Sequence, residues 1–174
     1  MAMTREQVWS MHNATATHQG LLTGLVAQTT GPVLECGVGH FSTPVLHYMC
    51  KHRPLLSLEN DKDWHSFFHP QFSNGIHCLY FFKDMEYADV LKQDFCKDLF
   101  WDVAFVDHSP CIKRKDTVQA LRSHAKYIVV HDAEPQAVAY EWGNLFDTFK
   151  YKKYDDFYGN GTMAVSDFAP IEME

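Results

Sequence analysis

Short apolar runs alternate with polar segments of helical length along most of this sequence. Several of the runs are apolar at every position, which is typical of strands in a parallel sheet that is covered on both faces. The runs predict five strands, at residues 32–36, 54–59, 76–81, 101–107 and 126–131. The segments around them predict helices at residues 4–29, 42–50, 61–68, 87–99, 112–124 and 135–149. This alternation predicts a doubly wound α/β fold, with helices on both faces of a mainly parallel sheet.

The last part of the chain breaks this alternation. Two strand-like runs, residues 150–158 and 162–168, are joined by Gly159-Asn160-Gly161, which is a hairpin turn signal. We therefore expect a seven-stranded sheet that ends in an antiparallel hairpin. No linker or repeat divides the sequence, so we expect an N-terminal helical arm at residues 1–29 and a single core domain at residues 30–174.

Composition narrows the class of protein. The 174 residues carry a formal net charge of −7, which argues against a protein that mainly binds nucleic acid or anionic lipid. No apolar run approaches the roughly 20 residues of a membrane-spanning helix, and the first residues lack the apolar segment of a secretory signal. The five cysteines are widely spaced and form no CxxC pair, so we expect reduced thiols in a cytoplasmic protein.

Polar residues and glycines gather where the predicted strands end. In an open parallel sheet, ligands bind beyond the carboxyl ends of the strands, at the point where strand order reverses. These strand ends therefore supply the candidate site. The candidate cofactor-binding residues are Glu35, Gly37, Gly39, Ser42, Thr43, Glu59, Asn60, Asp84 and Asp107. The candidate catalytic residues are Asp107, His108, His131 and Asp132.

The loop Gly37-Val38-Gly39, after the first strand, has the small residues that let a backbone turn tightly against a ligand. Glu59 follows Gly37 by 22 positions, which is about the spacing at which an acid after the second strand reaches a ribose diol. The pattern therefore indicates a nucleoside-bearing cofactor. Ser42 stands where a dinucleotide-binding loop has its third glycine, and the Glu35 carboxylate would repel a pyrophosphate but attract a cationic cofactor.

The runs LECGVGHFST and LSLEND resemble the first two motifs of class I S-adenosylmethionine-dependent methyltransferases. The resemblance covers most of the core domain, and it implies a methyltransferase domain that binds S-adenosylmethionine. It also implies that Gly37 and Gly39 line the methionine part of the cofactor, with Glu35 near its amino group. By the same resemblance, Glu59 binds the ribose and Asp84 lies near the adenine.

The runs WDVAFVDHSP and YIVVHDAE further resemble the catechol-type O-methyltransferases, in which aspartates after the fourth and fifth strands bind Mg²⁺. Asp107 and Asp132 match these two aspartates. Two positions depart from the pattern. Ala133 stands where the family has an asparagine, and Pro110 stands where it has a catalytic lysine, for which Lys113 is a shifted candidate. The resemblance thus implies a Mg²⁺ site at Asp107 and Asp132 that lacks one expected ligand.

Two routes stay open for removing the proton of a methyl acceptor. A Mg²⁺ ion on Asp107 and Asp132 would lower the pKa of an acceptor hydroxyl, whereas His108 or His131 would act as a general base. We favour the histidine route, because the third magnesium ligand is absent. The other histidines of the sequence are expected to be structural or to lie on the surface.

We therefore expect an S-adenosylmethionine-dependent methyltransferase that acts on a small or sugar-like hydroxyl acceptor. Nucleic acid and membranes are not expected as partners, and a homodimer that completes an open site is a hypothesis. Two other functions stay open. One is a nicotinamide-dependent oxidoreductase on the same type of sheet, and the other is an inactive sensor or partner subunit that binds the cofactor without transferring its methyl group.

Overall fold

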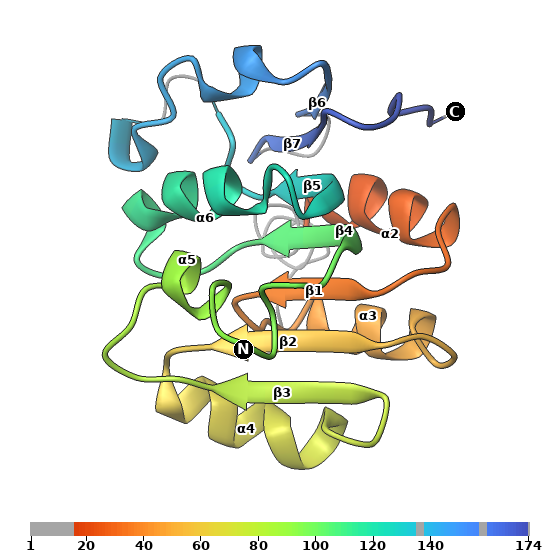
Figure 1. The fold of residues 1–174 in the computed structure, drawn as a ribbon, viewed down its shortest axis with the longest axis vertical. Helices are drawn as coiled ribbons and strands as arrows, with labels where there is room; N and C mark the ends of the chain where they lie inside the picture. Colours follow the sequence, from red (N-terminus) through yellow and green to blue (C-terminus); the bar gives the residue numbers. More distant parts are fainter. Residues whose placement is uncertain (1–15, 135–137, 157–159, 174) are drawn as a thin grey trace, which may run out of the picture.

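The computed structural model describes residues 16–134, 138–156 and 160–173. Seven strands form one sheet in the order β3-β2-β1-β4-β5-β7-β6 (Figure 1). The bounds of the strands are β1 (Val33–Cys36), β2 (Leu55–Glu59), β3 (His77–Phe81), β4 (Trp101–Val106), β5 (Ala125–Val130), β6 (Tyr151–Asp155) and β7 (Thr162–Ser166). Strands β1 to β5 pair in parallel, and β7 pairs antiparallel with both β5 and β6. The predicted parallel sheet with a closing antiparallel hairpin is confirmed, although Gly159 of the predicted turn lies outside the described residues.

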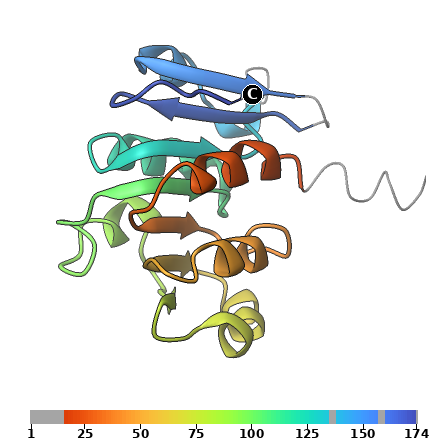
Figure 2. The same cartoon turned by 90° about the vertical axis from the view of Figure 1, so that its right-hand side faces the viewer.

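Helices cover both faces of this sheet. Their bounds are α2 (Gln19–Ala27), α3 (Thr43–Met49), α4 (Lys62–Phe72), α5 (Tyr87–Val90) and α6 (Arg114–Leu121). Figure 2 shows α2, α3 and α4 along one side of the sheet. Successive strand residues point to opposite faces, so β4 contributes to two core layers. Phe105 belongs to the layer under α2, whereas Val106 belongs to the layer that contains Val118 of α6.

Two of the predicted helices are wrong. The helix expected at residues 87–99 ends after the four residues of α5, and the chain continues in turns. In place of the helix expected at residues 135–149, the described part of the chain has two short 3-10 helices, η2 (Val138–Tyr140) and η3 (Leu145–Thr148). Glu141 and Gly143 between them have positive φ, which a regular α-helix excludes.

Other helices differ from the prediction in their bounds. Helix α4 continues to Phe72, past the predicted end at residue 68, because Phe68 and Phe72 lie one turn apart and pack together near Leu79 of β3. Helix α2 begins at Gln19, and residues 4–15 of the predicted N-terminal helix lie outside the described residues. None of the described helices is long and apolar enough to cross a membrane.

The strand order places the ends of β1 and β4 side by side. The chain runs outward from β1 through β2 to β3, and outward in the other direction from β4 to β5. The carboxyl ends of β1 and β4 therefore form the topological switch point, where open α/β sheets bind their ligands. This arrangement brings strand-end residues that are far apart in the sequence to one edge of the sheet.

Candidate functional site

A cavity of about 360 Å³ lies at the switch point. Its walls come from the loop after β1 (residues 37–42), the chain after β2 (residues 59–61 and Trp64), the chain after β4 (residues 107–109), and His18 just before α2. The predicted cofactor residues that line it are Gly37, Gly39, Ser42, Glu59, Asn60 and Asp107. The cavity therefore lies where the sequence predicts the cofactor.

Gly37 is the glycine that the loop after β1 requires. Its φ is +92°, a conformation that side chains disfavour, and a Cβ there would collide with the backbone of Asp107 and His108. Gly39, in contrast, has room for a Cβ, since the nearest atom would be the Ser42 hydroxyl oxygen at 3.4 Å. Gly37 therefore lets the end of β1 approach the end of β4, and this approach shapes the floor of the cavity.

Glu35 lies beneath this loop and is fully buried. Its carboxylate accepts hydrogen bonds from the Thr43 hydroxyl at 2.9 Å and the Ser57 hydroxyl at 2.5 Å, and the Gly39 amide donates to Thr43 Oγ1 at 2.9 Å. Burial raises the pKa of Glu35 to about 7, against the effect of hydrogen bonds from Ser42, Ser57 and Thr43. Glu35 and Thr43 thus support the loop from behind instead of lining the cavity. The expected contact of Glu35 with a cofactor amino group stays a prediction.

Glu59 joins the ends of β1 and β2 at the cavity wall. Its Oε2 accepts a hydrogen bond from the Val38 amide at 2.9 Å, and its Oε1 accepts from the amides of Asn60 and Asp61 at 2.8 and 2.7 Å. Burial raises its pKa, although these three backbone donors act in the opposite direction. Each carboxylate oxygen accepts about two hydrogen bonds, so Oε2 keeps a free lone pair for a ligand hydroxyl.

Asp84 is not brought to the cavity. It is exposed, does not line the cavity, and has a φ of +59° in the turn after β3. Asp and Asn are among the residues that tolerate this conformation best. The geometry gives Asp84 a place in a turn, and its contact with an adenine stays a prediction.

Arg114, the first residue of α6, lies between the two aspartates of the predicted magnesium site. Its guanidinium contacts Asp107 Oδ1 at 2.8 Å and Asp132 Oδ2 at 3.1 Å. Asp132 also accepts hydrogen bonds from the Tyr140 hydroxyl at 2.9 Å and the Asn160 amide at 2.8 Å. A positive guanidinium therefore occupies the position between the two carboxylates where a shared Mg²⁺ would bind. The residues present do not fit Mg²⁺ on Asp107 and Asp132, so that expectation is corrected.

His131, directly after β5, faces the carboxylate oxygen of Asp107 that Arg114 does not contact. Its Nδ1 lies 3.3 Å from Asp107 Oδ2 and 3.5 Å from Asp132 Oδ2, and its Nε2 lies 3.0 Å from the Thr17 hydroxyl oxygen. Burial lowers the pKa of His131, but the hydrogen bond and negative charge of Asp107 outweigh it, so the pKa is raised overall. The Asp107 carboxylate therefore favours the protonated form of this imidazole.

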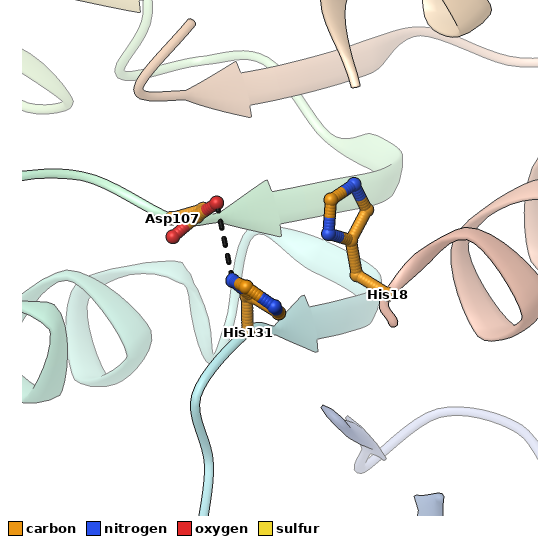
Figure 3. A group of neighbouring side chains, drawn as sticks. All are labelled: His18, Asp107 and His131. Atoms are coloured by element: carbon orange, nitrogen blue, oxygen red, sulfur yellow. Dashed lines mark ion pairs between the residues drawn. The ribbon is translucent and has the colours of Figure 1, made fainter. Parts of the chain in front are cut away.

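His18 completes a cluster with these two residues, and sequence reasoning missed it. Figure 3 shows His18, Asp107 and His131 facing one another from the start of α2 and the ends of β4 and β5. The His18 and His131 ring centroids are 4.9 Å apart, and the His18 ring lines the cavity. Burial, together with the nearby His131, lowers the pKa of His18 to about 4, so it is neutral at pH 7. No local motif surrounds His18, so no signal in the sequence could have selected it.

His108 occupies a different environment from His131. It is 1% exposed, its Nε2 lies 2.8 Å from the Thr117 hydroxyl oxygen, and its ring stacks on Tyr87 with centroids 3.9 Å apart. Burial and the positive charge of Arg114 lower its pKa to about 3. This geometry favours a packing role, and it does not favour the predicted role of His108 as a general base.

Comparisons with known proteins agree with this architecture. No protein-family model matches the sequence, and a search of curated proteins found no match. Among solved structures, cofactor-bound Rv0187 from MTB has a TM-score of 0.64 at 16% identity, and the match covers 97% of this chain and 83% of the Rv0187 chain. The O-methyltransferase TomG from Streptomyces achromogenes, in complex with SAM, has a TM-score of 0.61 at 12% identity, and the match covers 95% of this chain and 92% of the TomG chain. The N-methyltransferase NodS from Bradyrhizobium japonicum has a TM-score of 0.54 at 9% identity, and the match covers 91% of this chain and 95% of the NodS chain. The chain therefore has the Rossmann-like fold of class I S-adenosylmethionine-dependent methyltransferases.

Three buried histidines make the stability of the fold sensitive to acid. Burial lowers the pKa of His18 and His77 to about 4 and that of His108 to about 3, from an ordinary value of 6.5. As the pH falls below 6.5, the unfolded chain binds protons that the folded chain does not, so the free energy of unfolding decreases. Glu35 opposes this effect. Because its pKa is raised, the folded chain binds a proton at Glu35 between about pH 4.5 and pH 7 that the unfolded chain does not bind.

Glu59 and His131, whose pKa values are also raised, act in the same direction as Glu35, but the three large downward shifts outweigh them. We therefore expect the melting temperature to fall by on the order of 10 °C between pH 6.5 and pH 4. Thermal unfolding followed by circular dichroism at each pH measures this change. The His108→Gln variant serves as a control and should show a smaller drop. A melting temperature that stays constant over this range would contradict the assignment of neutral, buried histidines.

Proposed function

We propose that this protein transfers the methyl group of S-adenosylmethionine to a hydroxyl oxygen of a small or sugar-like acceptor. The observation that carries the proposal is the cavity at the switch point. The Gly37 loop, Glu59, His18 and Asp107 all border it. The fold that the chain shares with O- and N-methyltransferases supports methyl transfer from S-adenosylmethionine, and the hydroxyl acceptor is our proposal.

One part of the cavity suits the nucleoside of the cofactor. When bound, S-adenosylmethionine supplies an electrophilic methyl group on a positively charged sulfur. The free lone pair on Glu59 Oε2 is able to accept a hydrogen bond from a ribose hydroxyl. The Gly37 loop lines this part of the cavity, and the Asp107 carboxylate at the cavity wall attracts positive charge.

The other part of the cavity suits removal of the acceptor proton. As the new bond between the acceptor oxygen and the methyl carbon forms and the carbon–sulfur bond breaks, the hydroxyl proton has to leave. We assign this proton to the histidine cluster, in which His18 borders the cavity and neutral His131 accepts a proton that the Asp107 carboxylate then stabilises. Asp132 acts indirectly as a positioning residue, since it holds Arg114 against Asp107.

Calorimetric titration with S-adenosylhomocysteine tests the proposal. We expect saturable binding with one site per chain, and no saturable binding of reduced nicotinamide cofactor. The opposite result would favour the oxidoreductase. Incubation with S-adenosylmethionine and a panel of hydroxyl acceptors, with detection of S-adenosylhomocysteine, then separates a methyltransferase from an inactive cofactor-binding subunit.

Glu59→Ala is expected to weaken S-adenosylhomocysteine binding by about 1–3 kcal/mol, because it removes hydrogen bonds to the ribose. This loss corresponds to roughly 5- to 150-fold in the dissociation constant. Asp98→Ala is the matched control, and we expect it to have little effect, since Asp98 is exposed and lies outside the cavity wall. Unchanged affinity in Glu59→Ala would count against the position of the nucleoside.

A further inference from the structure

The histidine cluster contains buried nitrogen atoms that lack hydrogen-bond partners. Within the described part of the chain, neither ring nitrogen of His18 makes a well-aligned hydrogen bond, although the residue is only 1% exposed and its ring has a weak polar contact with the Phe41 backbone. His131 Nδ1 also makes no well-aligned hydrogen bond, and it faces Asp107 Oδ2 at 3.3 Å. Burying a polar group without a good hydrogen bond destabilises the fold, so these groups require an explanation.

The positions of these atoms fit a shared cation. One ligand atom from each of His18, Asp107 and His131 lies within 4.8 Å of the other two. The 3.3 Å between His131 Nδ1 and Asp107 Oδ2 is close to the edge of a tetrahedron whose metal–ligand bonds are about 2.0–2.1 Å long. The three side chains point to one centre from three separate elements (Figure 3).

We propose that His18, Asp107 and His131 bind one divalent transition-metal ion of the Zn²⁺ type. Two imidazoles and one carboxylate are ligands that Zn²⁺ prefers, whereas Mg²⁺ prefers oxygen ligands alone. The site is distinct from the Asp107 and Asp132 pair, which Arg114 holds. It has three protein ligands, and since His18 and Asp107 border the cavity, the remaining coordination position is open to it.

Residues around the cluster hold its ligands in place. Thr17 Oγ1 lies 3.0 Å from His131 Nε2, and Arg114 holds Asp107 Oδ1 at 2.8 Å, so Nδ1 and Oδ2 are left facing the centre. Such partners of the ligands orient them and tune the metal. Asp107 and Asp132 carry two negative charges against the one positive charge of Arg114, so these neighbours attract a divalent cation.

The open position connects the metal to the proposed reaction, and this connection alone rests on the proposed function. An acceptor hydroxyl bound there would have a lowered pKa and would release its proton to water. The two imidazoles would then act as ligands, and the cluster would promote loss of the proton through the metal. A proton shared between His131 and Asp107 is the metal-free arrangement that the experiment has to distinguish.

Calorimetric titration of the chelator-treated full chain with Zn²⁺ and with Mg²⁺ tests the site. We expect one Zn²⁺ per chain and no Mg²⁺ binding at the same concentration. His18→Ala and His131→Gln should each weaken Zn²⁺ binding by about tenfold or more, since each removes a ligand. His52→Gln is the matched control, because His52 is exposed and outside the cluster, and it should bind as the wild type does. Absence of saturable Zn²⁺ binding, or equal affinity in all the variants, would overturn the proposal.

X-ray absorption of the Zn²⁺-loaded wild-type protein gives a test that needs no variant. We expect imidazole scattering and metal–nitrogen distances of about 2.0–2.1 Å, and a spectrum without imidazole ligands would overturn the site. Titration of the same samples with S-adenosylhomocysteine separates the two proposals. S-adenosylhomocysteine binding without Zn²⁺ binding contradicts the metal site alone, and the reverse result contradicts the proposed function alone.

Discussion

His131→Gln is expected to lower methyl-transfer turnover by about 10²–10⁴-fold while S-adenosylhomocysteine affinity stays close to the wild-type value. The glutamine amide is able to keep a hydrogen bond to Thr17, but it cannot take up a proton beside Asp107 or replace the imidazole as a ligand. Steady-state turnover with an acceptor found in the panel, together with calorimetric affinity for S-adenosylhomocysteine, measures the two effects separately.

The matched control for this prediction is His108→Gln. His108 is buried against Tyr87 and bonded to Thr117, so its replacement should affect stability more than turnover. Wild-type turnover in His131→Gln would show that His131 does not take part in removing the acceptor proton. A loss of turnover in His108→Gln as large as that in His131→Gln would instead return the predicted role of general base to His108.

Arg114→Ala is expected to lower the free energy of unfolding by about 3 kcal/mol. The guanidinium is 7% exposed and holds Asp107 and Asp132, whose side chains are 25% and 15% exposed, so its loss leaves two largely buried carboxylates without their cation. It also removes hydrogen bonds to the carbonyl oxygens of His108 and His131. Urea denaturation followed by circular dichroism measures the change.

Arg122→Ala is the matched control for the loss of an arginine. Arg122 pairs with Asp167 at a more exposed position, where both side chains are more than a quarter accessible, so we expect a loss of about 1 kcal/mol or less. Equal losses in Arg114→Ala and Arg122→Ala would mean that the bridge between Asp107 and Asp132 contributes no more than a surface ion pair. The proposed positioning of Asp107 would then lose its physical basis.

Predictions that rest on neighbouring residues agree well with the structure. A strand that is buried on both faces has to be apolar at nearly every position, so residues 101–107 and 126–131 were recognisable without tertiary information. Helix bounds were harder to predict, because the core contacts of Trp142 and Phe146 and the positive φ of Glu141 override local helical preference in that segment.

The same contrast holds for the candidate site, where the sequence predicts some of the residues and tertiary packing sets the others. Gly37 and Glu59 follow buried strands, and parallel strands bring their carboxyl ends to one edge, so the sequence determined both the fold class and the position of the cavity wall. Only the tertiary structure decided what surrounds Asp107. Arg114 reaches it from the start of α6 and His18 reaches it from the start of α2, and no local periodicity records either approach. The physical reason is that a strand-end carboxylate has the same sequence pattern whether its partner is a metal, an arginine or a histidine, since that partner is set by packing between distant segments.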